Sequence, residues 1–134
     1  MLSVNELEDR LIDLAFAEDI GDGDHTTLCC IPDDAMGKSH LLIKEEGILA
    51  GVEVAKRVFA RFDPTMQVEV LINDGAHVKV GDIAMIVTGK VRSLLQTERL
   101  MLNIMQRMSG IATMTNKYVE RLKGTHTHVL DTRK

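Results

Sequence analysis

Beyond Gly89, apolar side chains recur three or four residues apart over an extended stretch of the chain. The positions are Leu94, Leu95, Met101, Leu102, Ile104, Met105, Met108 and Ile111. This spacing is typical of an α-helix, and a helix with so much apolar surface needs a partner, either further parts of the same protein or another subunit. Ser109-Gly110 predicts a break, and a second helix is expected to follow and to end at Lys123-Gly124. The fold must therefore be layered around this helical stretch.

The residues before Gly89 have the pattern of a small α+β unit. Ser3 and Glu6 have capping-box spacing, which predicts a first helix that ends near Gly21. A second helix is expected up to Phe62, where Asp63-Pro64 stops it. Short extended segments joined by tight turns are expected over 39–51, 66–72 and 83–87. We predict a first domain over residues 1–90 and the start of a second, helix-helix-strand, over 91–134.

Composition places the chain among ordinary globular proteins and narrows the classes of partner. Hydrophobic residues make up 45% and charged residues 27%, and the net charge of −4 argues against nucleic-acid binding. Aromatic residues are only 3%, so the 8 methionines are expected to fill core gaps. There is no signal-peptide pattern and no apolar run long enough for a membrane span, so a cytoplasmic protein is expected. Cys29 and Cys30 lack further cysteines at metal-ligand spacing, which favours simple thiols.

The chain ends in a basic pair placed after a short apolar run. Residues 127–130 predict a strand, and Thr132, Arg133 and Lys134 follow it directly. Side chains at the ends of parallel strands converge on ligand sites, and adjacent cations suit a substrate with several negative charges. The alternative is an exposed basic terminus. We expect the site to begin here and to continue beyond Lys134.

Other charged residues allow both a binding role and a solvated one. Arg99 is either a solvated partner of Glu98 or a planar group aimed at a carboxylate or phosphate. Arg107, near the predicted helix end, is interpreted as structural. Residues 18–27 are acidic and glycine-rich, so a loop is expected there. Its aspartates, Asp19, Asp22 and Asp24, approximate a calcium loop without the register of one, so a turn-forming loop is favoured.

Four segments, taken together and in order, resemble the quinolinate phosphoribosyltransferases, also called carboxylating nicotinate-nucleotide diphosphorylases. They are Glu18–Thr27, Glu98–Asn103, Gln106–Thr113 and Asp131–Lys134. The similarity runs from the first helix to the last residue. The acidic glycine loop and the complete Asp-Thr-Arg-Lys favour this family over the molybdenum-associated homologue and the nicotinate phosphoribosyltransferases.

The resemblance implies a fold and a reaction. The fold is α+β: an N-terminal α/β sandwich domain, followed by the first helices and first strand of an α/β barrel that this chain does not complete. The reaction joins quinolinate and phosphoribosyl pyrophosphate into nicotinate mononucleotide, pyrophosphate and carbon dioxide, in NAD synthesis. The cofactor is Mg²⁺, with its ligands expected beyond residue 134. Family members are homodimers or higher assemblies.

The resemblance also assigns roles to individual residues. Arg99 matches an arginine that is donated across the dimer to the quinolinate carboxylates, while Thr132, Arg133 and Lys134 match a strand segment that contacts substrate. Lys134 is also assigned as the catalytic residue. Fixed cations orient a dicarboxylate and stabilise the charge left by decarboxylation, so no nucleophile is needed. Residues 1–134 alone are predicted to be inactive.

Two other classes of function are considered. Residues 74–82 resemble the turn of biotin- and lipoyl-type carrier domains, but Lys79 lies within the turn rather than at an exposed hairpin tip. A non-catalytic interaction domain is the second alternative, because the long helix has an apolar face that needs a partner.

Overall fold

The computed structural model describes residues 1–132, which form four helices and five strands. In chain order they are α1 (Val4–Ile20), α2 (His25–Cys30), β1 (Met36–Leu42), β2 (Gly47–Ile48), α3 (Val52–Phe62), β3 (Gln67–Val70), β4 (His77–Val78), β5 (Ile83–Lys90) and α4 (Val91–Arg121). The helix predicted from the capping box and the helix stopped by Asp63-Pro64 are both confirmed. No helix within the described residues is long and apolar enough to cross a membrane.

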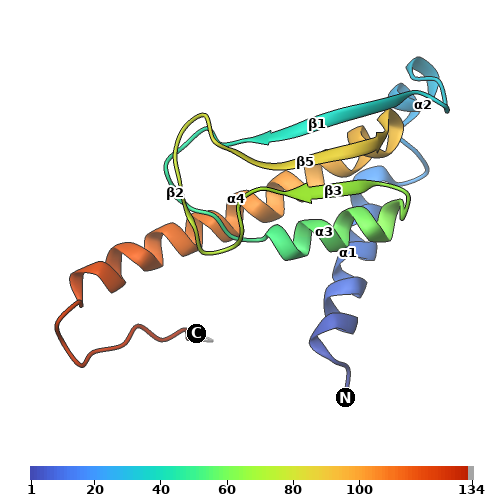
Figure 1. Ribbon diagram of the computed structural model, residues 1–134. Helices are drawn as coiled ribbons and strands as arrows, with labels where there is room; N and C mark the ends of the chain where they lie inside the picture. The colour runs from blue at the N-terminus through green and yellow to red at the C-terminus, as the bar shows by residue number, and fades with distance from the viewer. Residues whose placement is uncertain (133–134) are drawn as a thin grey trace.

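The strands form two small antiparallel units (Figure 1). The larger is a three-stranded sheet in the order β1-β5-β3, with Met36 opposite Lys90 and Val70 opposite Met85. The smaller pairs β2 with β4. Tight turns at Gly75 and Gly81, both with positive φ, flank β4.

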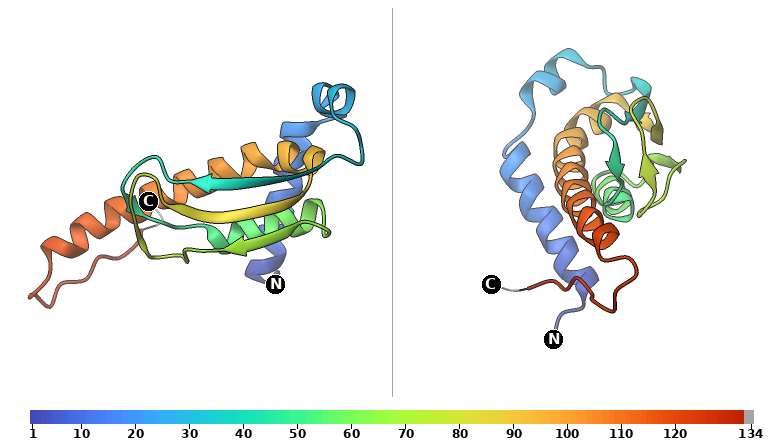
Figure 2. Two further views of the ribbon diagram at one scale, coloured as in Figure 1. Left: turned by 45° about the horizontal axis from the view of Figure 1, so that its top comes forward. Right: turned by 90° about the vertical axis from the view of Figure 1, so that its left-hand side faces the viewer.

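One face of the three-stranded sheet is covered by α3 and α4, which lie side by side, and α1 crosses outside them (Figures 1 and 2). The core is built from aliphatic side chains and methionines. Its buried members include Leu49, Val52, Val58, Phe59, Met66, Val78, Met85, Val87, Met101 and Met105. The prediction that methionines fill the core is confirmed for Met66, Met85, Met101 and Met105, whereas Met36, Met108 and Met114 are exposed.

Helix α1 is attached through a charged side, through the buried Ile12 and through Phe16, whose ring centroid lies 5.0 Å from that of Phe62 in α3. Ile12 is 2% exposed, whereas Leu7, Leu11 and Leu14, which recur at helical spacing, are more than half exposed. On the side that faces α3, carboxylates of α1 pair with Arg57 and Arg61 of that helix. The leucine spacing therefore marks a face of α1 that the rest of the described chain does not cover.

The predicted break at Ser109-Gly110 is wrong, because α4 runs unbroken from Val91 to Arg121. Gly110 has ordinary helical backbone, and the Ser109 hydroxyl bonds to residues outside the helix rather than to its own turn. Serine and glycine lower helix propensity, but tertiary packing overrides such preferences. Helix α4 starts directly after β5 and buries Thr97, Met101 and Met105 in the shared core. The domain division at residue 90 stays a prediction.

Two further expectations are corrected. The acidic segment predicted as a loop over 18–27 is shorter, because α1 continues to Ile20 and α2 begins at His25. The strand predicted over residues 127–130 is not formed, and this segment is an exposed coil that folds back along α4 (Figure 1). A strand requires a neighbour for its backbone hydrogen bonds, and no described strand lies beside it.

Candidate functional site

Arg99 lies on the outer side of α4, two residues from the fully buried Thr97. Its side chain is 76% exposed, and Nη1 lies 3.4 Å from Oδ1 of Asp19 in the last turn of α1. An exposed ion pair at this distance contributes little to stability. The guanidinium is therefore solvated, as one interpretation predicted, but its neighbouring carboxylate is Asp19 rather than Glu98. The alternative role of Arg99, as a group aimed at a ligand carboxylate or phosphate, stays a prediction.

The acidic residues near Arg99 serve local structure. Asp24 is the N-cap of α2, where its Oδ1 accepts from the Thr27 backbone N–H at 3.1 Å. Hydrogen bonds from Thr27, first from its hydroxyl and then from its N–H, lower the pKa of Asp24. Asp22 lies 3.4 Å from the His25 imidazole. Within residues 1–132, no cluster of three or more potential ligands is arranged for a metal ion.

The basic pair at the end of the chain falls outside the described residues. Arg133 and Lys134 are both in that part, so the structure does not place them. Thr132 is exposed, and its backbone N–H donates to Oδ1 of Asp131 at 2.8 Å. Of the four predicted site residues, only Arg99 and Thr132 are described, and Arg99 is paired with α1 rather than with the C-terminal segment.

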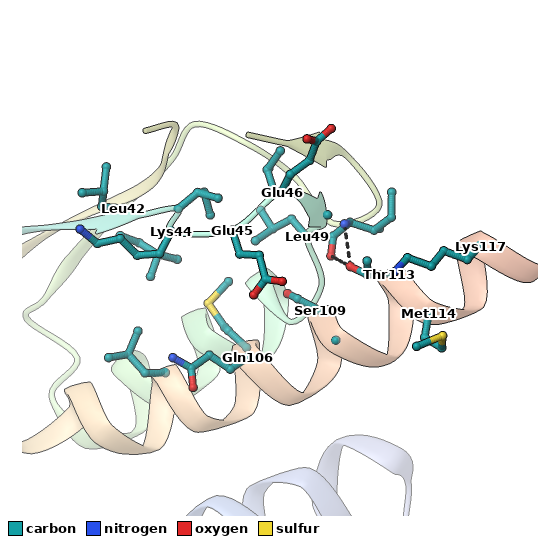
Figure 3. Close-up of a pocket in the computed structure, with 18 residues that line it drawn as sticks. Leu42, Lys44, Glu45, Glu46, Leu49, Gln106, Ser109, Thr113, Met114 and Lys117 are labelled. Atoms are coloured by element: carbon teal, nitrogen blue, oxygen red, sulfur yellow. Dashed lines mark hydrogen bonds between the residues drawn. The ribbon is translucent and has the colours of Figure 1, made fainter. Parts of the chain in front are cut away.

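A groove of about 570 Å³ lies between α4 and the loop that joins β1 to β2 (Figure 3). Its apolar lining comes from side chains such as Leu49, Leu102 and Met105, and polar groups stand along it. Glu45 extends into the groove toward Ser109, while Glu46 points away. Of the predicted site residues that the structure describes, neither Arg99 nor Thr132 lines this groove.

Two aspartates of the carrier-like turn over residues 74–82 accept hydrogen bonds that stabilise local structure. The Asp74 carboxylate accepts from the backbone N–H groups of Val52 and Glu53 at 2.8 and 3.3 Å, which caps the start of α3. Asp82 accepts from the Lys79 N–H at 2.8 Å and closes the turn before β5. Asp74 and Asp82 of this segment therefore stabilise local structure.

Sequence reasoning did not single out Arg92. Its Nε donates to the Ile31 carbonyl at 2.8 Å and its Nη2 to the Leu28 carbonyl at 3.1 Å, so it holds the end of α2 against the start of α4. A lone arginine at the start of a helix carries no signal for such a role. The contacts join residues about sixty positions apart, which spacing along the chain does not reveal.

Comparison with known proteins gives one consistent result. A sequence profile described as "Quinolinate phosphoribosyl transferase, N-terminal domain" matches residues 24–109. The chain is 44% identical over 125 residues to quinolinate phosphoribosyltransferase (decarboxylating) 1b of Nicotiana tabacum, covering 92% of this chain and 35% of the relative. A probable nicotinate-nucleotide pyrophosphorylase (carboxylating) of Synechocystis is 39% identical over 118 residues, covering 88% of this chain and 40% of the relative.

Solved structures agree. NadC from Streptococcus pyogenes superposes with a TM-score of 0.92 at 36% identity, covering 99% of this chain and 47% of that one. The nicotinate-nucleotide pyrophosphorylase from Francisella tularensis gives a TM-score of 0.90 at 35% identity, covering 98% of this chain and 47% of that one. The chain spans about a third of the length of the tobacco relative and just under half of these two structures.

Proposed function

The chain belongs to the quinolinate phosphoribosyltransferase family, and we propose that its full-length gene product transfers the phosphoribosyl group of phosphoribosyl pyrophosphate to quinolinate. The products are nicotinate mononucleotide, pyrophosphate and carbon dioxide. The names of the tobacco and Synechocystis relatives support this assignment. The structural observation that carries it is Arg99, an exposed guanidinium inside the family-matched region with one weak protein partner.

Arg99 is proposed to bind quinolinate. Quinolinate has two adjacent carboxylates, and a guanidinium can grip a carboxylate through two parallel hydrogen bonds. Loss of one carboxylate as carbon dioxide leaves negative charge on the ring, which fixed cations stabilise. Thr132, Arg133 and Lys134 are proposed to supply the other side of the site, with Lys134 as the catalytic residue.

The remaining features of the family are proposals for this protein as well. These are an α/β sandwich over residues 1–90, the beginning of an α/β barrel over 91–134, a cytoplasmic homodimer in which Arg99 completes the neighbouring site, and Mg²⁺. The described residues offer no cluster to bind the ion, so its ligands are proposed to lie elsewhere in the enzyme. Residues 1–134 alone are proposed to be inactive, because the relatives that carry the activity are more than twice as long.

The test is Arg99→Ala in the full-length gene product. Removal of a charged hydrogen-bonding partner is expected to weaken quinolinate binding by about tenfold or more. Arg107→Ala is the matched control, because Arg107 is also exposed on α4. Quinolinate affinity is measured by calorimetry. An Arg99→Ala protein with unchanged quinolinate affinity contradicts the assignment.

A mixing experiment tests the proposed dimer. Arg99→Ala and Arg133→Ala subunits are expected to be impaired separately and to recover part of the activity when mixed. If Arg99 serves the neighbouring subunit, a hybrid dimer contains one site with both arginines. No recovery on mixing, despite proven subunit exchange, contradicts a site shared between subunits.

A further inference from the structure

Two hydroxyl groups on α4, one turn apart, bind the backbone of the segment that contains β2. The Ser109 hydroxyl accepts from the Ala50 N–H at 2.9 Å and donates to the Ala50 carbonyl at 3.1 Å. The Thr113 hydroxyl accepts from the Ile48 N–H at 2.9 Å and donates to the Ile48 carbonyl at 3.5 Å. Figure 3 shows the Thr113 pair. We call these four hydrogen bonds the hydroxyl clasp.

The hydroxyl clasp supplies the hydrogen bonds that a neighbouring strand would make on the edge of segment 48–50 that faces α4. On the opposite edge, the segment bonds to the β4 region, with Leu49 N–H donating to Ala76 and the Leu49 carbonyl accepting from Gly75. Backbone groups of alternate residues point to opposite edges of a strand, so Ile48 and Ala50 face α4. Without the two hydroxyls, four part-buried backbone groups would lose their partners, which is costly.

The dimensions of helix and strand make this contact specific for one register. Residues four apart in an α-helix are separated by about 6 Å along the axis. Residues two apart in a strand are separated by about 6.6 Å. Ser109 and Thr113 therefore match Ala50 and Ile48, whereas a slide of α4 by one residue would break all four hydrogen bonds.

Glycines allow the close approach. A Cβ at Gly47 would lie 2.5 Å from the Thr113 hydroxyl oxygen, and a Cβ at Gly51 would lie 3.1 Å from the Met108 sulfur. Any side chain at Gly47 would push α4 away from the strand. The segments 47–51 and 109–113 are thus complementary. Glycines in the first allow α4 to come close, and the second has two hydroxyls that bond to the backbone of the first.

Arg99 lies between this clasp and a second attachment point on the same unbroken helix. Ser93 donates its hydroxyl to Oδ2 of Asp63 at 2.6 Å, which fixes the beginning of α4. The clasp fixes α4 about 15 Å beyond Arg99, at ten residues and 1.5 Å per residue. One attachment leaves a helix free to pivot, whereas two attachments define its direction. The apolar contacts of Met101 and Met105 between them tolerate sliding far better than hydrogen bonds do.

We propose that Ser109 and Thr113 are positioning residues for Arg99: the hydroxyl clasp sets the register and direction of α4 and so places the guanidinium that binds the substrate carboxylates. The inference rests on the proposed function. A displacement of about 1 Å at a binding group is enough to change substrate use strongly, so loss of the clasp acts through Arg99.

The test is a double-mutant cycle in the full-length gene product. Ser109→Ala combined with Thr113→Val removes the clasp and nearly keeps side-chain volume, and Thr115→Val, an exposed threonine of α4, is the control. With Arg99 present, the clasp variant is expected to weaken quinolinate binding about fivefold or more. In the Arg99→Ala background the same change is expected to have less than about a twofold effect, because the group that it positions is gone. Thr113→Ser, which keeps the hydroxyl, is expected to restore binding relative to Thr113→Val.

The outcomes separate the two proposals. If Arg99→Ala leaves quinolinate affinity unchanged, the proposed function of Arg99 is wrong and the positioning role falls with it. If Arg99→Ala weakens binding but the clasp variant does not, or if the clasp variant weakens it equally in both backgrounds, only the positioning role is overturned. Should the double variant not fold, the single variants Ser109→Ala and Thr113→Val, each lacking two of the four hydrogen bonds, carry the same comparison.

Discussion

Arg61 of α3 and Asp13 of α1 form a bidentate pair, in which Nε and Nη2 of the guanidinium each donate to one oxygen of the carboxylate. One turn away, Arg57 donates to Asp9 at 2.6 Å and to the side chain of Asn5 at 2.7 Å. Helix α1 thus turns its charged side to α3 and its leucines to the outside. These polar contacts join α1 to α3 in addition to the apolar contacts of Ile12 and Phe16.

We predict that Asp13→Asn lowers the free energy of unfolding at neutral pH. The difference in this free energy between the variant and the wild type is expected to narrow in acid. The hydrogen bond from Arg61 lowers the pKa of Asp13 against a smaller opposing effect of desolvation. A lowered folded-state pKa stabilises the folded state above the unfolded pKa, and this contribution is lost as pH falls through the folded pKa. Urea unfolding between pH 7 and about pH 3 measures the effect. Glu18→Gln, on α1 outside this network, is the control; a pH-independent difference contradicts the prediction.

We predict that Ile12→Ala lowers the free energy of unfolding by about 2 kcal/mol or more, because a buried aliphatic side chain is replaced by a cavity. Leu11→Ala is the matched control on the neighbouring position. Leu11 is 64% exposed against 2% for Ile12, so its truncation is expected to cost under about 0.5 kcal/mol. Urea unfolding of both variants checks this. Equal losses would show that the leucine face of α1 is covered in solution.

Local signals in the sequence predicted α1, α3, β3 and β5, but not α2, which lies partly where a loop was expected. The Ser3 capping box, Asp63-Pro64 and the glycine turns act within a few residues, so the elements that they delimit are where the sequence places them. The buried face of α1 was not predictable, because leucine spacing does not say what lies opposite. What lies opposite is α3, about fifty residues away, whose Arg57 and Arg61 pair with α1 and whose Phe62 packs on Phe16.

The candidate site was predictable only where a motif marked it. Arg99 was identified from its motif, and the structure places its guanidinium exposed on α4 beside Asp19. Its role in binding stays a prediction. Ser109-Gly110 was misread as a helix break, because both residues weaken helices in isolation. In the structure this part of α4 packs against the backbone near Gly47, a contact between residues about sixty positions apart in the sequence. Spacing along the chain carries no sign of that contact.

We predict that Arg92→Lys loosens α2. Arg92 holds two carbonyls of the α2 region and also lies 3.4 Å from Asp33. A lysine ammonium is a single point and cannot reproduce the planar fork, so we expect a loss of about 1–2 kcal/mol and faster proteolysis in the α2 region. Limited proteolysis with mass spectrometry locates the cut. Arg121→Lys, an exposed control at the other end of α4, is expected to change neither the stability nor the rate of proteolysis. Equal cleavage of both variants in the α2 region contradicts the role of Arg92 in holding α2.

We predict that Gly110→Ala stabilises the chain by about 0.5–1 kcal/mol, although the glycine follows Ser109 in the segment first interpreted as a break. Gly110 lies inside α4 with ordinary helical backbone, and a Cβ there meets no atom within 4 Å. Alanine loses less conformational entropy than glycine when a helix forms, so the folded state gains. Gly81→Ala is the contrasting variant. It also has open space, but its φ of +95° strains any residue with a Cβ, so a loss is expected. Thermal and urea unfolding of the two variants give opposite signs if α4 is continuous in solution, and a loss for Gly110→Ala would place a break in the helix after all.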